Sequence, residues 1–356
     1  MTNSLLFSIN QRDDLFIDGI VELTNKSSTL ENQLSVGYLK KQKFSDGEIC
    51  VDFIDSVRGK KVFLLLSPLN SNDILRLAFS IDAAKRAGAS EIIPILPYFP
   101  YSRQDKKDQV RGPIGAKVIA EIIEQRGATS VILFDLHADQ IQGFFNIPVT
   151  HIESKNVFDN KLLEVVKTLG GPNEVVLCGP DAGSGKRIKR MRDQLNKHYN
   201  INLNYVIIDK TRKKANFIDE MVVIGNVENK HVIILDDIVD TAGTLCKAST
   251  VLLEAGAKSV KAVISHGVLS GSAMETIGES DLSEIIISDS VQLKKPIELC
   301  EKDFNELRCH SILIACKKLT TVSLLEQIAL SISATMNKFS YESLVTKNIT
   351  YTLETN

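Results

Sequence analysis

The chain contains no tryptophan, and aromatic residues make up only 6% of its 356 positions. It also lacks an excess of positive charge, since 42 Lys and Arg face 44 Asp and Glu, for a formal net charge of −2 at pH 7. Proteins that bind nucleic acid usually present a basic surface and aromatic side chains on which bases stack. We therefore expect no DNA or RNA partner.

Long apolar runs are missing as well. No stretch approaches the roughly 20 apolar residues that a membrane-spanning helix needs, and the opening MTNSLLFSIN lacks the basic start and apolar core of a signal peptide. We expect a cytoplasmic protein with no membrane partner. The cysteines form no CxxC pair and are too sparse for a disulfide scaffold, so we expect reduced thiols rather than bridges or zinc ligands. They are Cys50, Cys178, Cys246, Cys300, Cys309 and Cys316.

A repeated pattern of helix ends and β-branched runs is present instead. It recurs from Lys85, Glu124 and Leu253: a helix end closed by glycine, a very short connection, then a β-branched run. Such units are typical of a parallel sheet that is covered on both faces. The expected helices span residues 72–86, 114–125, 157–168, 185–198 and 322–332. The expected strands span residues 5–9, 49–54, 61–66, 92–96, 131–136, 174–179, 204–209, 221–225, 231–237 and 260–264.

The length of the chain suits two domains better than one hydrophobic core. We predict an α/β fold with two tandem domains, each a mainly parallel sheet flanked by helices. The first domain covers residues 1–150, the second covers residues 151–312, and a helix with a polar tail covers residues 313–356.

The most informative segment runs from His231 to Thr244 and reads HVIILDDIVDTAGT. An apolar strand leads to two acids, a Gly-Thr turn and the start of a helix. A turn of this kind presents backbone N–H groups and a helix N-terminus, which suits a phosphate, and Asp236 and Asp237 then lie within reach of sugar hydroxyls. The letters DDxxD also occur in the all-helical prenyl diphosphate synthases, but the apolar run before the acids predicts a strand.

Five further segments carry polar residues with chemical potential. FSDGE (44–48) places Asp46 and Glu48 on one face if it is extended, and Gly47 also permits a turn. The prolines in PYFPYSRQDKK (97–107) predict an irregular extended path after a strand. In DLHADQIQGFF (135–145) the polar residues of DLHAD alternate. The other two segments are the Gly-rich CGPDAGSGKR (178–187), which fails the Walker A spacing, and the basic VIIDKTR (206–212).

In order and spacing these segments resemble those of the ribose-phosphate diphosphokinase (PRPP synthetase) family, over about residues 5–290, with its phosphoribosyltransferase fold. The resemblance implies transfer of the diphosphoryl group of Mg-ATP to O1 of ribose 5-phosphate, which gives 5-phosphoribosyl 1-diphosphate (PRPP) and AMP. It also implies a homo-oligomer built from dimers, with a hexamer as one form.

The resemblance assigns roles residue by residue. It implies that ribose 5-phosphate is bound by Asp236, Asp237, Asp240, Thr241, Ala242, Gly243 and Thr244. It implies that ATP is bound by Phe44, Asp46, Gly47, Glu48, Arg103 and Gln104. It implies magnesium ligation by His137 and Asp181, and catalysis by Lys210 and Arg212.

Two segments depart from the family pattern. The diphosphate loop reads PDAGSGKR where the family usually has PDVGGVVR, and the catalytic segment reads DKTRKK where the family has DKRRPR. These changes keep open a catalytically weak regulatory subunit. A nucleobase phosphoribosyltransferase is the other alternative, although it would not need FSDGE, RQDKK or DLHAD.

Overall fold

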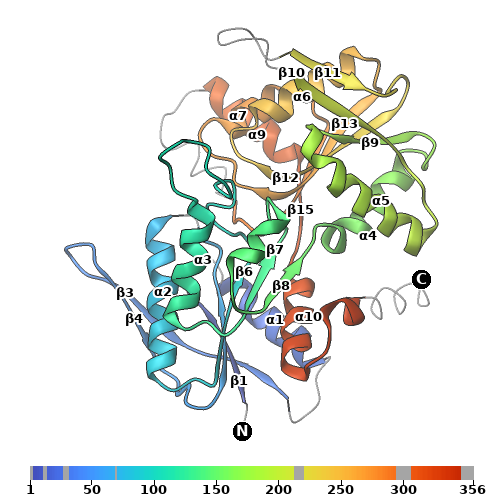
Figure 1. Ribbon diagram of the computed structural model, residues 1–356. Coiled ribbons are helices and arrows are strands. Elements are labelled where there is room, and N and C mark those ends of the chain that lie inside the picture. The colour runs from blue at the N-terminus through green and yellow to red at the C-terminus, as the bar shows by residue number, and fades with distance from the viewer. Residues whose placement is uncertain are drawn as a thin grey trace. The chain divides into compact units, whose positions relative to one another are not determined.

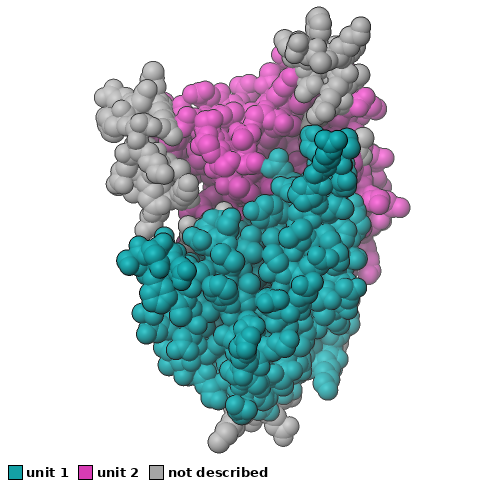
Figure 2. Space-filling model, turned by 60° about the vertical axis from the view of Figure 1, so that its left-hand side comes forward, with its two compact units in different colours: residues 1–153, 324–356 teal, residues 154–323 magenta. Residues whose placement is uncertain are grey.

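A computed structural model describes residues 3–10, 14–26, 32–68, 70–211, 220–293 and 306–345 of the chain. The chain divides into two compact units, drawn in teal and magenta in Figure 2. Unit 1 comprises residues 1–153 together with the segment that begins at Leu324, and unit 2 comprises residues 154–323.

Unit 1 is built on a six-stranded sheet in the order β2-β1-β5-β6-β7-β8, and all of its neighbouring strands are parallel. Helices α2 and α3 pack side by side, as do α1 and α10, and the two pairs lie on opposite sides of the sheet (Figure 1). A separate hairpin, β3–β4, packs against α2. The strands are β1 (Ser4–Ser8), β2 (Leu34–Val36), β3 (Leu39–Lys43), β4 (Ile49–Phe53), β5 (Lys61–Leu65), β6 (Glu91–Leu96), β7 (Val131–Phe134) and β8 (Val149–Ile152). The helices are α1 (Asp14–Lys26), α2 (Ser71–Arg86), α3 (Gly115–Arg126), the 3₁₀ helix η1 (Asp139–Phe144) and α10 (Leu325–Asn337).

Unit 2 is built on a seven-stranded sheet in the order β11-β10-β9-β12-β13-β14-β15, which is parallel except for the β10–β11 pair. Its strands are β9 (Val175–Gly179), β10 (Asn204–Thr211), β11 (Glu220–Ile224), β12 (His231–Val239), β13 (Ser259–Gly267), β14 (Glu284–Ser288) and β15 (Leu319–Val322). Its helices are α4 (Lys155–Thr168), the 3₁₀ helix η2 (Ala182–Ser184), α5 (Gly185–Tyr199), α6 (Gly243–Glu254), α7 (Ala273–Glu279) and α9 (Glu306–Lys318).

The central strand of unit 2 shows why the apolar run at HVIIL is continuous. Val232 and Ile234 belong to a core cluster that includes residues of α6, α7 and α9, whereas Ile233 and Leu235 belong to a cluster with α4 and α5. Successive side chains of a strand point to opposite faces, so a sheet that is covered on both faces needs apolar residues at every position. The predicted fold class, with mainly parallel sheets flanked by helices, is confirmed.

The repeated α-to-β pattern is confirmed in the same way. Helices α2, α3 and α6 end just before Gly88, Gly127 and Gly256, which all have a positive φ, and β6, β7 and β13 follow within a few residues. Among the described residues no helix is both long and apolar enough to cross a bilayer. The five cysteines that the structure describes are free thiols.

Close packing of α7 against α9 gives a test of the fold. An alanine Cβ at Gly278 would lie 2.0 Å from the backbone carbonyl oxygen of Ser311, which cannot move without shifting α9. We expect Gly278→Ala to cost about 3 kcal/mol of stability, and hence to lower the melting temperature by roughly 6–12 °C in differential scanning fluorimetry. Gly143→Ala is the control, because its Cβ would meet nothing within 4 Å. Equal melting temperatures for the two variants would contradict the packing of these helices.

Candidate active site

The phosphate-type turn of unit 2 follows the central strand β12. Ala242 has a left-handed backbone, with φ 63°, and α6 begins at the next residue. Positive φ is uncommon for a residue with a side chain, and such backbone is concentrated at functional sites. Gly243 has open space where a side chain would be, because nothing lies within 4 Å of its ideal Cβ position. The turn therefore leaves room for a ligand directly at the N-terminus of α6.

A second loop holds this turn from the side. The backbone N–H of Ser270 donates to the carbonyl oxygen of Asp240 at 3.0 Å, and the Ser270 hydroxyl donates to the Asp240 carboxylate. The N–H groups of Val268 and Leu269 both donate to the carbonyl oxygen of Val239, at 3.0 and 3.2 Å. These bonds fix the path of the backbone through the turn.

The acid pair lies near the carboxyl end of β12. Asp237 is 7% exposed, and its backbone N–H donates to the Asp236 carboxylate at 2.9 Å. Burial and the neighbouring carboxylate of Asp237 raise the pKa of Asp236 well above its usual value, and Arg187 acts in the opposite direction. The charge of Arg187 therefore bears on both acids, through the pKa of Asp236 and through an ion pair with Asp237.

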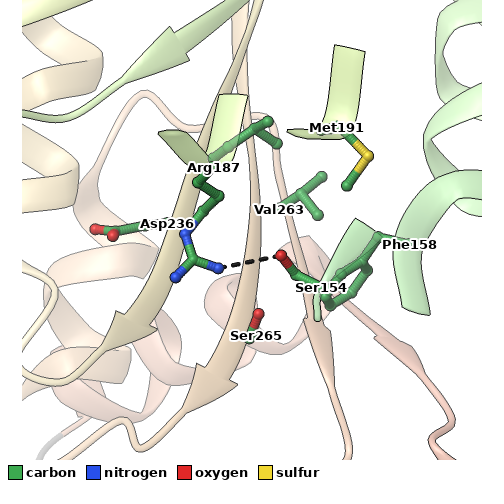
Figure 3. Close-up of a pocket in the computed structure, with 8 residues that line it drawn as sticks. Ser154, Phe158, Arg187, Met191, Asp236, Val263 and Ser265 are labelled. Carbon is green, nitrogen blue, oxygen red and sulfur yellow. Dashed lines mark hydrogen bonds between the residues drawn. The ribbon is translucent and has the colours of Figure 1, made fainter. Parts of the chain in front are cut away.

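A small pocket lies beside this acid pair (Figure 3). The Arg187 guanidinium group lies between Asp236 and Ser154 in that view, and it donates to the Ser154 hydroxyl at 3.1 Å. Its Nη2 atom is 4.0 Å from Oδ1 of Asp237. The pocket is lined by Ser154, Phe158, Arg187, Met191, Leu235, Asp236, Val263 and Ser265.

The Gly-rich segment forms a tight turn after β9. Asp181 caps η2 by accepting the backbone N–H of Ser184 at 3.0 Å, and the Ser184 hydroxyl donates back to the Asp181 carbonyl oxygen. An alanine Cβ at Gly179 would lie 2.2 Å from the Ser184 hydroxyl oxygen, so a side chain there would displace that hydroxyl from its bond to Asp181. Asp181 is therefore at the start of the turn that leads into α5.

Of the predicted catalytic residues, Lys210 and Arg212, the structure describes the backbone of Lys210. Lys210 belongs to β10, where its backbone pairs with Met221 of the antiparallel strand β11. The sequence predicted a strand over residues 204–209, and the structure continues it through Thr211. Arg212 lies outside the described residues.

In unit 1 the FSDGE segment is the tip of the β3–β4 hairpin. The backbone N–H of Phe44 donates to the carbonyl oxygen of Glu48 at 2.8 Å, and the Glu48 N–H donates to the Asp46 carboxylate at 2.9 Å. Gly47 has a positive φ of 97°. The segment forms a turn and is not extended, because Gly47 adopts a conformation that favours glycine. Phe44 is 52% exposed at this tip.

Arg103 and Gln104 follow β6, at the carboxyl end of the sheet where ligands bind in open α/β folds. Tyr101 has φ 59°, and the Gln104 N–H donates to its carbonyl oxygen at 2.9 Å, so this path is a turn rather than an extended segment. The Gln104 carbonyl oxygen accepts the N–H of Ala116 at 3.2 Å. Its side-chain oxygen lies 2.4 Å from where a Cβ at Gly115 would be, so that glycine makes room for it.

The DLHAD segment follows β7, the neighbour of β6. Asp135 has φ 33° and is buried, whereas His137 is exposed, so the side chains do not continue the regular alternation of a strand. The Leu136 N–H donates to Nε2 of His151 on β8 at 3.0 Å. A histidine on the next strand therefore holds the backbone directly before His137.

His151 also belongs to a group of possible metal ligands with Asp139 and Glu153, whose ligand atoms lie within 4.8 Å of one another. Nε2 accepts the Leu136 N–H, and Nδ1 lies 3.3 Å from the side-chain amide nitrogen of Gln142, so both ring nitrogens are already engaged. The two carboxylates remain as oxygen donors, the kind that magnesium prefers.

Sequence reasoning did not identify Arg187, His151 or Glu153. Arg187 matches the final residue of the family pattern PDVGGVVR, so the motif itself contained the signal. His151 lies in β8, the strand next to β7, and Glu153 directly follows it. Polar residues at the same end of neighbouring parallel strands are the signal that could have found them.

The central strand with its acid pair, phosphate-type turn and helix N-terminus defines unit 2 as a phosphoribosyltransferase-type domain. Comparisons agree: a family model of the phosphoribosyl transferase domain matches residues 151–296, and a model of the N-terminal domain of ribose phosphate pyrophosphokinase matches residues 6–127. The chain belongs to the ribose-phosphate pyrophosphokinase family, which sets it apart from the nucleobase phosphoribosyltransferases and makes it an enzyme.

Individual relatives cover most of the chain. The ribose-phosphate pyrophosphokinase of Caldanaerobacter subterraneus subsp. tengcongensis is 42% identical over 272 residues, which are 76% of this chain and 81% of that protein. The one from Wolinella succinogenes is 44% identical over 256 residues, 71% of this chain and 79% of that protein. The crystal structure of phosphoribosylpyrophosphate synthetase from Mycobacterium smegmatis matches with a TM-score of 0.78 and 30% identity, over 94% of this chain and 99% of that one.

Proposed function

We propose how this chain carries out the reaction of its family, the formation of PRPP and AMP from ATP and ribose 5-phosphate. O1 of the sugar attacks the β-phosphorus of ATP in line, the bond from the β-phosphorus to the oxygen that it shares with the α-phosphorus breaks, AMP leaves with that oxygen, and the proton of the O1 hydroxyl passes to solvent. Transfers of this type depend mainly on positioning and electrostatic stabilisation. The observation that carries the assignment is the acid pair and phosphate-type turn at the end of β12, in a chain whose first unit belongs to the same family.

Unit 2 is assigned the sugar. The backbone N–H groups and hydroxyls from Asp240 to Thr244 would bind the 5-phosphate, supported by the open space at Gly243 and the positive φ of Ala242. Asp236 and Asp237 would accept hydrogen bonds from the 2- and 3-hydroxyls of the ribose.

Unit 1 is assigned the nucleotide. Arg103 would pair with its phosphates and Gln104 would hydrogen-bond the base, both from the loop after β6. The FSDGE turn, with its exposed Phe44, would contact the nucleotide of a neighbouring subunit. This requires a homo-oligomer, and the exposed apolar side chains of Leu75 and Phe79 on α2 support one. Since ATP and ribose 5-phosphate are made inside cells, we infer a cytoplasmic enzyme.

Magnesium is assigned to His137 and Asp181. The carboxylates of Asp139 and Glu153 next to the His137 loop fit an ion that prefers oxygen, either directly or through water. When bound, magnesium would neutralise charge on the ATP phosphates. Lys210 and Arg212 would add positive charge as negative charge develops on the transferred group.

AMP formation tests the proposal. Purified protein should form AMP from ATP only when ribose 5-phosphate and Mg²⁺ are both present, as measured by chromatography of the nucleotides. AMP formation that is indifferent to the sugar, or no AMP under any condition, would contradict the assignment.

The His151 contact predicts a difference between two substitutions. His151→Leu removes the acceptor of the Leu136 N–H, and we expect the KM for ATP to rise by about 10-fold because the loop that carries His137 shifts. The side-chain oxygen of His151→Gln can still accept this bond, so its KM should stay near that of the wild type. Steady-state AMP formation at saturating ribose 5-phosphate measures both, and equal values for the two variants would count against this role.

A further inference from the structure

Arg187 is a positively charged group close to the acid pair of β12 that comes from a different element, the first turn of α5. Its side chain is 16% exposed and that of Asp237 is 10% exposed, so solvent screens this ion pair less than it would on the surface. One side of the guanidinium group donates to the Ser154 hydroxyl at 3.1 Å, and the other faces Oδ1 of Asp237 at 4.0 Å. The group is therefore fixed by one hydrogen bond and lies at ion-pair distance from the acid pair.

Apart from Asp236, the described residues that line the pocket around the Arg187 guanidinium group carry no charge. Phe158 of α4, Met191 of α5 and Val263 of β13 are apolar, and Ser265 is neutral. Arg187 and Asp236 are the charged residues of this lining, with Asp237 adjacent. Two neighbouring carboxylates with little access to water repel each other, and one guanidinium group anchored on Ser154 offsets that repulsion.

We propose that Arg187 is a positioning residue for ribose 5-phosphate, which holds Asp236 and Asp237 in place as acceptors for the sugar hydroxyls while Ser154 fixes its own orientation. This inference rests on the proposed function of the acid pair. The first turn of α5 is also the last part of the diphosphate loop, so this segment would serve both the sugar and the group transferred to it. Arg187 acts through the two acids and takes no part in bond formation.

The charge of Arg187 has a consequence for pH dependence. Burial and Asp237 raise the pKa of Asp236, and Arg187 lowers it. A carboxylate accepts hydrogen bonds from hydroxyls, and protonation removes part of that capacity. Without Arg187 the pKa of Asp236 rises further, so the acid limb of kcat/KM for ribose 5-phosphate moves to higher pH.

Three variants and a control test the proposal by steady-state PRPP formation over a range of pH, with melting temperatures recorded for each. For Arg187→Gln we expect the KM for ribose 5-phosphate to rise about 30-fold. The KM for ATP should not change, and the acid limb should move to higher pH.

Arg187→Lys keeps the positive charge but loses the planar guanidinium group with its two faces for Ser154 and Asp237. Its acid limb should stay near wild type, and its KM for ribose 5-phosphate should rise less than that of Arg187→Gln. Ser154→Ala should raise the KM several-fold without moving the acid limb. Lys189→Gln removes an exposed positive charge from the same helix and should behave as wild type.

The outcomes separate this inference from the function on which it rests. If the wild-type protein forms no PRPP, the proposed function fails. If the wild type is active and Arg187→Gln retains its KM for ribose 5-phosphate and its acid limb, only the role of Arg187 is overturned. Should Arg187→Gln fail to fold, Arg187→Lys and Ser154→Ala decide, and wild-type kinetics in both would reject the proposal.

Discussion

Replacement of Lys210 by alanine is expected to lower kcat for AMP formation by about 1000-fold, because a positive charge placed where charge develops acts mainly in the transition state. The KM values for ATP and ribose 5-phosphate should change little, since an interaction made only in the transition state does not contribute to substrate binding. The backbone of Lys210 is paired with Met221 in β11, so the sheet fixes the backbone position of this residue.

Rapid-quench measurement of AMP at saturating substrates gives kcat for this variant. Lys213→Ala is the matched control, because Lys213 belongs to the same basic run but stands where the family pattern has proline. It should retain activity close to wild type. A Lys210→Ala enzyme with normal kcat, or one whose only defect is a raised KM, would remove Lys210 from the catalytic role.

Asp237→Asn is expected to lower kcat/KM for ribose 5-phosphate by about 100-fold, because a hydrogen bond to a charged acceptor is replaced by a weaker one. The same change removes a cause of the raised pKa of Asp236. The pKa of Asp236 should therefore fall, and the acid limb of kcat/KM should move to lower pH, opposite to the shift expected for Arg187→Gln.

Initial rates of PRPP formation between about pH 5 and 9 show the direction in which the limb moves. Asp193→Asn, an exposed acid on α5, controls for the loss of one negative charge. If Asp237→Asn and Arg187→Gln shift the limb in the same direction, the electrostatic account of the acid pair is wrong.

Much of the fold can be predicted from local patterns in the sequence. The sequence HVIILDDIVDTAGT contains a strand, a turn and a helix start within one segment, and the structure places β12 and α6 there. The glycine-closed helix ends before β6, β7 and β13 are also local signals. Each depends on backbone geometry and apolar periodicity within about a dozen residues, which a single sequence displays.

The remaining features depend on tertiary contacts. The segment from Leu324 joins unit 1 through the packing of α10 on α1, and no local pattern indicates which unit it contacts. The alternation in DLHAD suggested one common face, but the positive φ of Asp135 breaks it, and this conformation is held by β8. The role of Arg187 likewise depends on Ser154, more than 30 residues away in sequence.

The central claim is that this chain makes PRPP by moving a diphosphoryl group intact, and the products observed by ³¹P NMR test it most directly. With ATP, ribose 5-phosphate and Mg²⁺, we predict a sugar 5-phosphate signal, a coupled pair of diphosphate signals on the same sugar, and AMP in equal amount. The appearance of ADP with a singly phosphorylated anomeric carbon, or of free orthophosphate in place of the coupled pair, would contradict it.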